Sequence, residues 1–147
     1  MNENIKFKDN VRVKHFRNGI LIDEYTSHNQ TQDAVLDEVI DAIDTGSCND
    51  IITMAIGTGS GQATSDTALG SISSYETGAS CSATQAGDGE SVEFSATFTA
   101  GGAWAIEEAG LSTAADGTSG LMFYDDSIST SMTAGDTLQI DWTVSVS

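Results

Sequence analysis

The last eleven residues of the chain alternate strictly between polar and apolar positions. The apolar members are Leu138, Ile140, Trp142, Val144 and Val146. Successive side chains of a strand point to opposite faces, so this period of two describes a strand buried on one face and solvated on the other. The pattern predicts a strand over 137–147 in an antiparallel sheet, to which earlier strands must supply the rest of the core.

Two more alternating segments, residues 11–17 and 20–25, lie on either side of Asn18-Gly19. Asn-Gly between two such segments is a strong hairpin signal, because both central residues of a type I′ turn need a positive φ. The sequence therefore predicts an N-terminal β-hairpin.

One segment, residues 31–45, has the periodicity of a helix. Its apolar face consists of Val35, Leu36, Val39, Ile40 and Ile43. We expect Asn29 to cap its start with Gln32 at the capping-box position, and Gly46 to end it in the left-handed conformation. The apolar stripe is expected to lie against the sheet.

The remaining apolar runs are short and bounded by Gly, Ser, Thr and Asn. They predict a central strand at 51–56, a short edge strand at 72–75, strands at 92–98 and 103–111, and a segment at 121–124 that begins a closing hairpin. We interpret 57–61 as a flexible glycine turn, since a phosphate-binding loop needs Lys and Ser or Thr where Gln62-Ala63 follow, and 86–89 as a turn. Seven or eight strands and one helix predict a mainly β fold: a single small β-sandwich of jelly-roll character.

The charge is unevenly distributed along the chain. The 147 residues hold 22 acidic and five basic side chains, a net charge of −17. All five basic residues and two acidic ones lie in residues 1–17, whose net charge is +3, and the other 20 acidic residues lie in 18–147. Adaptation to high salt explains such acidity, and so does an acidic body whose basic segment docks on an acidic partner. Either reading argues against nucleic-acid binding, which needs Lys and Arg.

The charge division suggests two parts of one domain. Residues 1–30 form a basic segment and hairpin, a predicted docking element, and residues 31–147 form the acidic sandwich body. The predicted docking residues are Lys6, Lys8, Arg12, Lys14 and Arg17. Cross-strand pairing with Asp23 and Glu24 is the structural alternative for this clustering.

Catalytic chemistry finds little support. After His28 the chain has no His, Lys or Arg, and His15 and His28 have no obvious partner, so a nucleophile in the body would lack a base. Glu107-Glu108 and Asp125-Asp126 are adjacent pairs whose side chains point to opposite faces of a strand. We expect no enzyme activity and no catalytic residue.

Metal and disulfide chemistry are also weakly indicated. Cys48 and Cys81 lack zinc-site spacing, and both buried thiols and a disulfide remain open. We expect no cofactor, although acidic loop residues leave calcium open: Asp88, Glu90, Asp116, Asp125, Asp126 and Asp136. No apolar run is long enough for a transmembrane helix, and the N-terminus lacks a signal-peptide core.

The order of several short motifs resembles a loose group of small structural proteins of tailed viruses, found in tails, fibres and head decorations. The motifs are Arg17-Asn18-Gly19, the single helix, Ile56-Gly57-Thr58-Gly59, the segment 65–70, Phe98-Thr99-Ala100, the segment 106–111, Gly120-Leu121-Met122-Phe123, Gly135-Asp136-Thr137-Leu138 and the closing 142–147. Such proteins commonly carry a proline after the Gly-Thr-Gly turn, and this chain has none. The resemblance implies a virion component, and the acidity implies a virus of a halophilic archaeon.

Together these observations predict a non-enzymatic virion protein that forms a symmetric homo-oligomer on the particle exterior, as a turret, capsid decoration, tail or fibre component. Its expected partners are itself and other virion proteins, such as the major capsid or tail protein, with no nucleic acid and no membrane. The alternative is a ligand- or receptor-binding sandwich that holds glycans or cell surfaces through Trp104, Tyr75 or Tyr124, with or without calcium.

Overall fold

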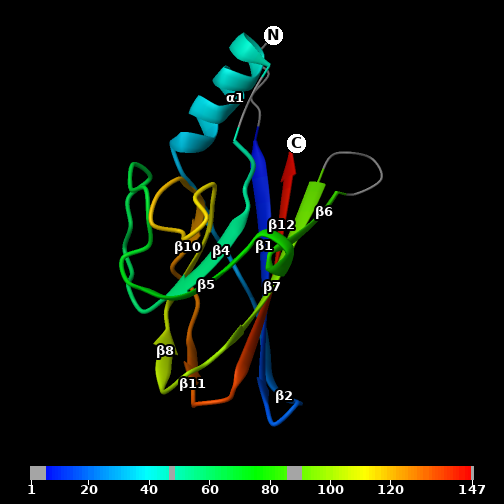
Figure 1. Cartoon of the computed structure of the whole chain (residues 1–147), viewed down its shortest axis with the longest axis vertical. Helices are drawn as coiled ribbons and strands as arrows, with labels where there is room; N and C mark the ends of the chain where they lie inside the picture. Colours follow the sequence, from blue (N-terminus) through cyan, green and yellow to red (C-terminus); the bar gives the residue numbers. More distant parts are fainter. Residues whose placement is uncertain (1–5, 47–48, 86–90, 147) are drawn as a thin grey trace.

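Two five-stranded antiparallel sheets face each other and form a small β-sandwich (Figure 1). The computed structural model describes residues 6–46, 49–85 and 91–146. Sheet A has the order β2 (Ile20–Ser27), β1 (Phe7–Arg17), β12 (Thr137–Val146), β7 (Ser91–Thr99) and β6 (Ser82–Gln85). Sheet B has the order β3 (Gln30–Thr31), β10 (Leu121–Asp125), β9 (Glu108–Ser112), β4 (Thr53–Gly57) and β5 (Ile72–Thr77).

Three smaller elements complete the described chain. They are a two-stranded ribbon of β8 (Trp104–Ile106) and β11 (Thr130–Met132), the helix α1 (Ala34–Thr45) and a 3₁₀ turn η1 (Gly78–Ser80). The chain passes repeatedly between the sheets, with the hairpin β1–β2 in A, β4–β5 in B and β6–β7 in A. The predicted mainly β sandwich, with an N-terminal hairpin and, among the described residues, one α-helix, is confirmed, and its jelly-roll character stays a prediction.

The closing strand lies where its alternation places it. β12 pairs with β1 on one side and β7 on the other, so it is the middle strand of sheet A. Its apolar side chains are buried from Leu138 to Val144, whereas the alternating polar ones are half-buried. Trp142 is the largest fully buried side chain and lies between the sheets. Burial of this one face provides the main stabilisation of the sheet.

The N-terminal hairpin turns at Asn18-Gly19 as predicted, with φ values of 52° and 75°. A positive φ at both positions is the signature of a type I′ turn. β1 contributes Val11 and Val13, both fully buried, to the core, and ten of its residues pair with β12. The basic strand is therefore an interior strand of sheet A and not an appendage.

Two expectations about strand order are wrong. The predicted strand 103–111 is two strands in different sheets, β8 and β9. They separate at Glu107, whose N–H donates to the Gly57 carbonyl. The predicted closing hairpin of 121–124 with the last strand does not form, since β10 pairs with β9 and β3 in sheet B while β12 is in sheet A. Alternation indicates which residues form strands but not the sheet that each strand joins. The described residues also hold more strands than the predicted seven or eight.

The helix α1 begins three residues later than predicted, because Gln30–Thr31 is used as a strand against β10. Asp33 stands at its N-cap, so the predicted Asn29 cap is wrong. Gln32 does not complete a capping box either, since its buried side chain donates to the carbonyls of Ala63 and Asp66. The helix ends at Gly46 in the left-handed conformation, as expected.

The helix projects from one end of the molecule instead of lying flat on a sheet (Figure 1). Val35 is its one buried residue among those described. Leu36, Ile40 and Ile43 are exposed, so the expectation that the whole apolar stripe packs on the sheet is wrong. Two other predictions lie outside the described residues: the turn at 86–89 and the pairing of Cys48 with Cys81, of which Cys81 is buried.

Candidate functional site

The basic side chains of β1 form a row on the outer face of sheet A. Lys8, Arg12 and Lys14 alternate with Val11 and Val13, which point into the core, so the three cations share the solvent-facing side. Lys6 precedes the strand and is exposed. We call Lys6, Lys8, Arg12 and Lys14 the basic row.

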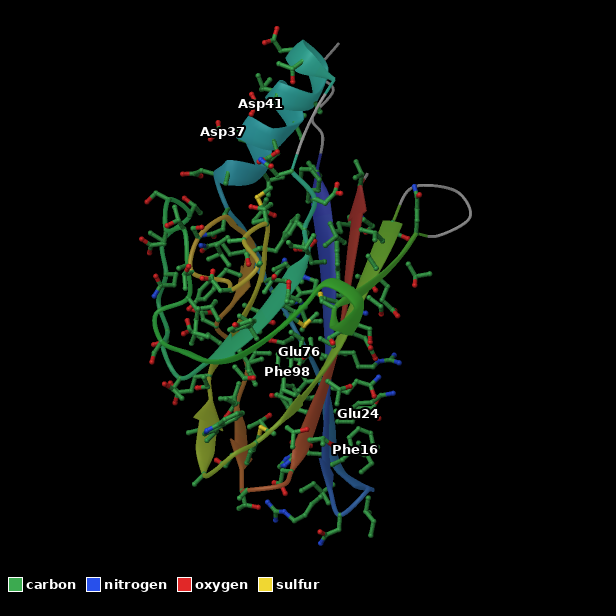
Figure 2. All side chains as sticks on the ribbon, viewed as in Figure 1. Phe16, Glu24, Asp37, Asp41, Glu76 and Phe98 are labelled. Carbon is green, nitrogen blue, oxygen red and sulfur yellow. The ribbon has the colours of Figure 1, made fainter. Side chains whose placement is uncertain are left out.

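Neighbouring strands compensate part of this charge. The Arg12 Nε lies 3.8 Å from the Glu24 Oε1 of β2, and both side chains are about half exposed. Lys14 is the register partner of Glu24, while no ion pair within the described residues involves Lys6, Lys8 or Lys14. Cross-strand pairing thus explains the presence of Arg12 on β1, whereas Lys6, Lys8 and Lys14 remain available to contact a partner. Figure 2 shows Glu24 and Phe16 near the hairpin end.

Arg17 does not belong to the row, although the sequence grouped it with the other four. Its Nε and terminal nitrogen donate to the two carboxylate oxygens of Asp136 at 3.0 and 2.9 Å. The same carboxylate bonds His15 Nε2 at 2.8 Å and accepts the Thr133 N–H. Arg17 therefore ties the hairpin to the turn before β12, a structural contact that an unaligned sequence does not reveal.

Arg17 and the Thr133 N–H hold the pKa of Asp136 well below its usual range. Because a carboxyl with a lowered pKa favours the folded state when ionised, this stabilisation is present at neutral pH and is lost as the pH falls below the ordinary aspartate pKa. His15, for which the sequence offered no partner, is buried against this carboxylate, and His28 is exposed.

A second buried carboxylate, Glu108, holds the loop that covers sheet B. It accepts the backbone N–H groups of Gly59 at 3.0 Å, Ser71 at 2.8 Å and Gly70 at 3.1 Å, and the Tyr124 hydroxyl at 3.1 Å. Glu108 is fully buried. The 57–61 segment, interpreted from the sequence as a flexible turn, is in fact fixed by this carboxylate.

The adjacent acidic pairs are split between opposite faces, as the sequence predicts. Glu107 is exposed beside buried Glu108, and Asp126 is exposed beside buried Asp125. Asp125 accepts the Ser27 hydroxyl at 2.9 Å, and burial raises the pKa of this carboxyl. In this arrangement neither pair offers two carboxylates to one substrate.

The predicted calcium ligands are not gathered in one place. Asp136 is occupied by Arg17, and Asp116 accepts both the N–H and the hydroxyl of Thr118 in its own turn. Within residues 6–46, 49–85 and 91–146 no group of three or more His, Cys, Asp or Glu side chains is arranged to hold a metal ion. Asp88 and Glu90 lie outside the described residues.

Of the aromatic residues considered for ligand binding, Tyr124 is buried and donates to Glu108, so it cannot meet a ligand at the surface. Burial also raises the pKa of its hydroxyl. Tyr75 is exposed on the edge strand β5, and Trp104 is half-buried on β8 in the separate ribbon. The structure therefore removes one of the three side chains from the glycan-binding alternative.

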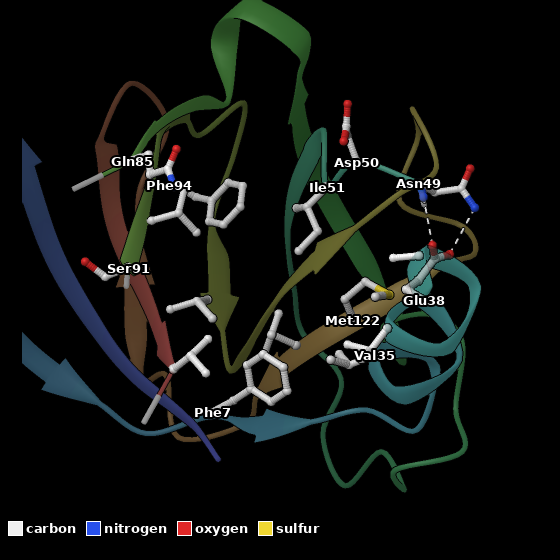
Figure 3. A pocket seen from close by; sticks show the side chains of 16 residues that line it. Phe7, Val35, Glu38, Asn49, Asp50, Ile51, Gln85, Ser91, Phe94 and Met122 are labelled. Carbon is white, nitrogen blue, oxygen red and sulfur yellow. Dashed lines mark hydrogen bonds between the residues drawn. The ribbon is translucent and has the colours of Figure 1, made fainter. Parts of the chain in front are cut away.

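An open apolar groove lies beneath the helix, between the ends of the two sheets (Figure 3). Its volume is about 460 Å³. Val35 and Val39 of α1, Phe7 of β1 and Met122 of β10 line it. At its rim the Glu38 carboxylate accepts the backbone and side-chain N–H groups of Asn49.

No protein-family model, curated protein or solved structure matches the chain. Within the part of the chain that the structure describes, no helix combines the length and the hydrophobicity needed to cross a bilayer. The most distinctive part of the molecular surface is the basic row.

Proposed function

We propose that the protein is a non-enzymatic structural component of a tailed-virus particle, which assembles as a symmetric homo-oligomer on the particle exterior. The position is that of a capsid turret or decoration, or of a tail or fibre component. The basic row meets an acidic surface of a neighbouring virion protein, such as the major capsid or tail protein. The order of motifs that resembles small tailed-virus structural proteins supports this class.

One observation carries the proposal: Lys8 and Lys14, which form no ion pair within the described residues, lie with Arg12 on one solvent-facing sheet surface of an otherwise acidic chain. Lys8, Arg12 and Lys14 share that surface with exposed Thr97 and Thr99 of β7. The rest of the chain, with its 20 acidic residues beyond position 17, repels acidic partners. Glu24, Asp141 and Glu93 lie on the same outer face, so the positive charge is a narrow strip along β1. A strip of this kind favours a docking orientation that brings β1 against an acidic surface.

The experiment has to preserve β1, since removing residues 1–17 would delete an interior strand of sheet A. We therefore choose Lys8→Gln, Arg12→Gln and Lys14→Gln together. The matched control is Ser60→Glu, Ser65→Glu and Thr67→Glu, which changes the net charge by the same amount at exposed positions of the loop between β4 and β5, away from the outer face of sheet A. Circular dichroism verifies that both variants fold.

The readout is the copy number of each variant in purified particles of the encoding virus, measured against the major capsid protein after complementation in molar salt. We expect the Gln variant to fall at least about tenfold, because it loses three charge contacts of about 0.5 kcal/mol or more each, and the control to remain incorporated. Incorporation of the Gln variant at the wild-type copy number would refute docking through the basic row. Absence of the wild-type protein from particles would refute the virion function itself.

A further inference from the structure

Three phenyl rings line the open groove beneath α1. Phe7 of β1 and Phe94 of β7 belong to sheet A, and Phe123 of β10 belongs to sheet B. Figure 3 shows Phe7 and Phe94 along the groove. The rings of Phe7 and Phe123 stand edge to face, with centroids 6.0 Å apart and an interplanar angle of 66°. With a volume of about 460 Å³, the groove has the size and the apolar lining of a small-molecule site.

Both charged side chains that line the groove are acidic. Glu38 of α1 and Asp50, which lies between α1 and β4, stand at its rim (Figure 3). The backbone and side-chain N–H groups of Asn49 donate to Glu38 at 2.7 and 2.9 Å, and these hydrogen bonds lower the pKa of its carboxyl. Glu38 is therefore ionised at neutral pH, and the mouth of the groove carries negative charge.

Within the described residues, no Lys, Arg or His lines the groove. Lys6 and Lys8 flank Phe7 in the sequence, but Lys8 points to the outer face of sheet A and Lys6 is exposed before the strand. No Lys or Arg follows Arg17 in the chain, so α1 and the segment after it offer no positive charge. An anionic amphiphile would meet only carboxylates at the rim, whereas a cationic one would meet counter-charges.

A third carboxylate lies beside the groove. Asp9 follows Phe7 by two residues on the same face of β1, and it is the register partner of Val144, which also lines the groove. Side chains of directly opposite residues are neighbours on one face of a sheet. The Asp9 Oδ1 is buried and has no hydrogen-bond partner among the described residues. A cation in the groove would offset part of the unfavourable free energy of this unpaired charge.

We propose that the groove binds a small organic cation, an ammonium group that carries an apolar chain. The chain packs against Val35, Val39 and the phenyl rings and displaces water from them. The ammonium group is attracted by the negative faces of the aromatic rings and by the carboxylates of Glu38 and Asp50. A quaternary ammonium fits this lining best, because it presents methyl groups to the rings and needs no hydrogen-bond acceptor. The proposal is independent of the virion function.

The probe is n-octyltrimethylammonium, and n-octanol and n-octyl sulfate are neutral and anionic controls with the same chain. Isothermal titration calorimetry at pH 8 measures their binding below their micelle concentrations, in the lowest salt in which circular dichroism shows the folded protein. We expect one cation per chain with a Kd below about 1 mM. Octanol is expected to bind at least about fivefold more weakly, and octyl sulfate more weakly still, because they lack the attraction to the rings and carboxylates.

Two charge variants separate the groove from the overall negative charge of the chain. Glu38→Gln with Asp50→Asn removes the two carboxylates at the rim. Asp37→Asn with Asp44→Asn is the control, which removes the same charge from exposed positions on the opposite face of α1. We expect the first variant to bind the cation at least about fivefold more weakly and octanol as the wild type does, and the control to change the affinity for the cation less than about twofold.

A lysine in the groove tests the position of the site. Val39→Lys brings an ammonium group to the wall of the groove, where it competes with the ligand, so we expect binding of the cation to be lost. Leu36→Lys is the matched control, since Leu36 is 64% exposed on α1 and does not line the groove. This control is expected to keep its affinity within about twofold. Circular dichroism verifies that both variants fold.

Several outcomes would overturn the proposal. Equal affinities for the three amphiphiles would mean that the groove is a nonselective apolar surface, and equal weakening by both charge variants would assign the attraction to the net charge. Binding that survives Val39→Lys would place the site elsewhere, and a wild type that binds no cation would refute the site. None of these measurements involves virus particles, so the virion function is tested separately by incorporation.

Discussion

The outer faces of the two sheets differ, since one is covered by a loop and the other is open to solvent. The outer face of sheet B is covered by the loop between β4 and β5, which buries Leu69 against Ala55, Leu121 and Tyr124. The outer face of sheet A is open, and its polar residues alternate along β1, β7 and β12. The loop over sheet B has to be anchored, whereas the open face of sheet A has to be soluble. We therefore expect substitutions under the covered face to change stability and substitutions on the open face to change association.

Two carboxylates, one on each sheet, differ in how far their oxygens are satisfied by hydrogen bonds. Glu108, beneath the covered face, accepts hydrogen bonds from four donor groups. Asp9 points inward from β1 of sheet A, and its Oδ1 has no hydrogen-bond partner among the described residues. Burial raises the pKa of Asp9 to about 7. A satisfied carboxylate stabilises its surroundings, and an unsatisfied one costs stability once it ionises.

The largest expected effect is that of Glu108→Ala. This change removes the fully buried carboxylate that accepts the N–H groups of Gly59, Gly70 and Ser71 and leaves a cavity in its place, so we expect the free energy of unfolding to fall by about 3 kcal/mol or more. The adjacent and exposed Glu107 is the matched control, for which Glu107→Ala should cost less than about 0.5 kcal/mol. Urea denaturation followed by tryptophan fluorescence measures both, and equal effects would show that the anchor does not hold the loop.

A smaller effect of opposite sign is expected for Asp9→Asn. Because the pKa of Asp9 is raised by burial, the folded state binds its proton more tightly than the unfolded state, and Asp9 therefore destabilises the wild type as the pH rises from about 4 to about 7. After allowance for its partial exposure, this amounts to about 1–2 kcal/mol. Asp9→Asn should be more stable than the wild type at pH 8 and about equally stable at pH 4.

Thermal unfolding across that pH range tests this prediction. The wild type and Asp9→Asn are compared under the same salt, and the difference between their unfolding free energies is plotted against pH. A difference that does not change between pH 4 and pH 8 would mean that the carboxylate is solvated in the folded state.

The smallest stability effect is expected on the open face. Arg12→Ala removes the exposed pair with Glu24, whose nitrogen and oxygen are 3.8 Å apart, so the free energy of unfolding should change by less than about 0.5 kcal/mol. Urea denaturation in molar salt measures the change. A loss of 2 kcal/mol would show that the basic row serves the fold and not a partner, and the contrast between the two outer faces would fail.

Three short motifs that are separate in the sequence come together in the structure. Residues 57–59, residues 65–70 and residues 106–111 are far apart in the chain, yet the first two contribute the loop that Glu108 of the third anchors. A Cβ on Gly59 would lie 2.6 Å from the Glu108 Oε1, so glycine is required there by close approach. These three motifs thus encode an anchored loop, and their spacing alone did not reveal this contact.

Local patterns predicted the features that depend on neighbouring residues. Alternation located the strand Thr137–Val146, Asn18-Gly19 located the hairpin turn, and the charge count located the basic segment, because each depends on residues a few positions apart. The same alternation predicted that Glu107 and Glu108 point to opposite faces, but not which of the two is buried.

Tertiary contacts decided the remainder. Three features depend on residues up to 119 positions apart, whose proximity no local period encodes. They are the division of residues 104–111 between β8 and β9, the exposure of Leu36, Ile40 and Ile43 on α1, and the pairing of Arg17 with Asp136. Helical periodicity shows that α1 has an apolar face, but the space between the sheets accepts Val35 and leaves Leu36, Ile40 and Ile43 in solvent. The sequence determined which side chains are apolar, and the packing of the sheets determined which of them are buried, because burial depends on the partner surface as well as on the residue.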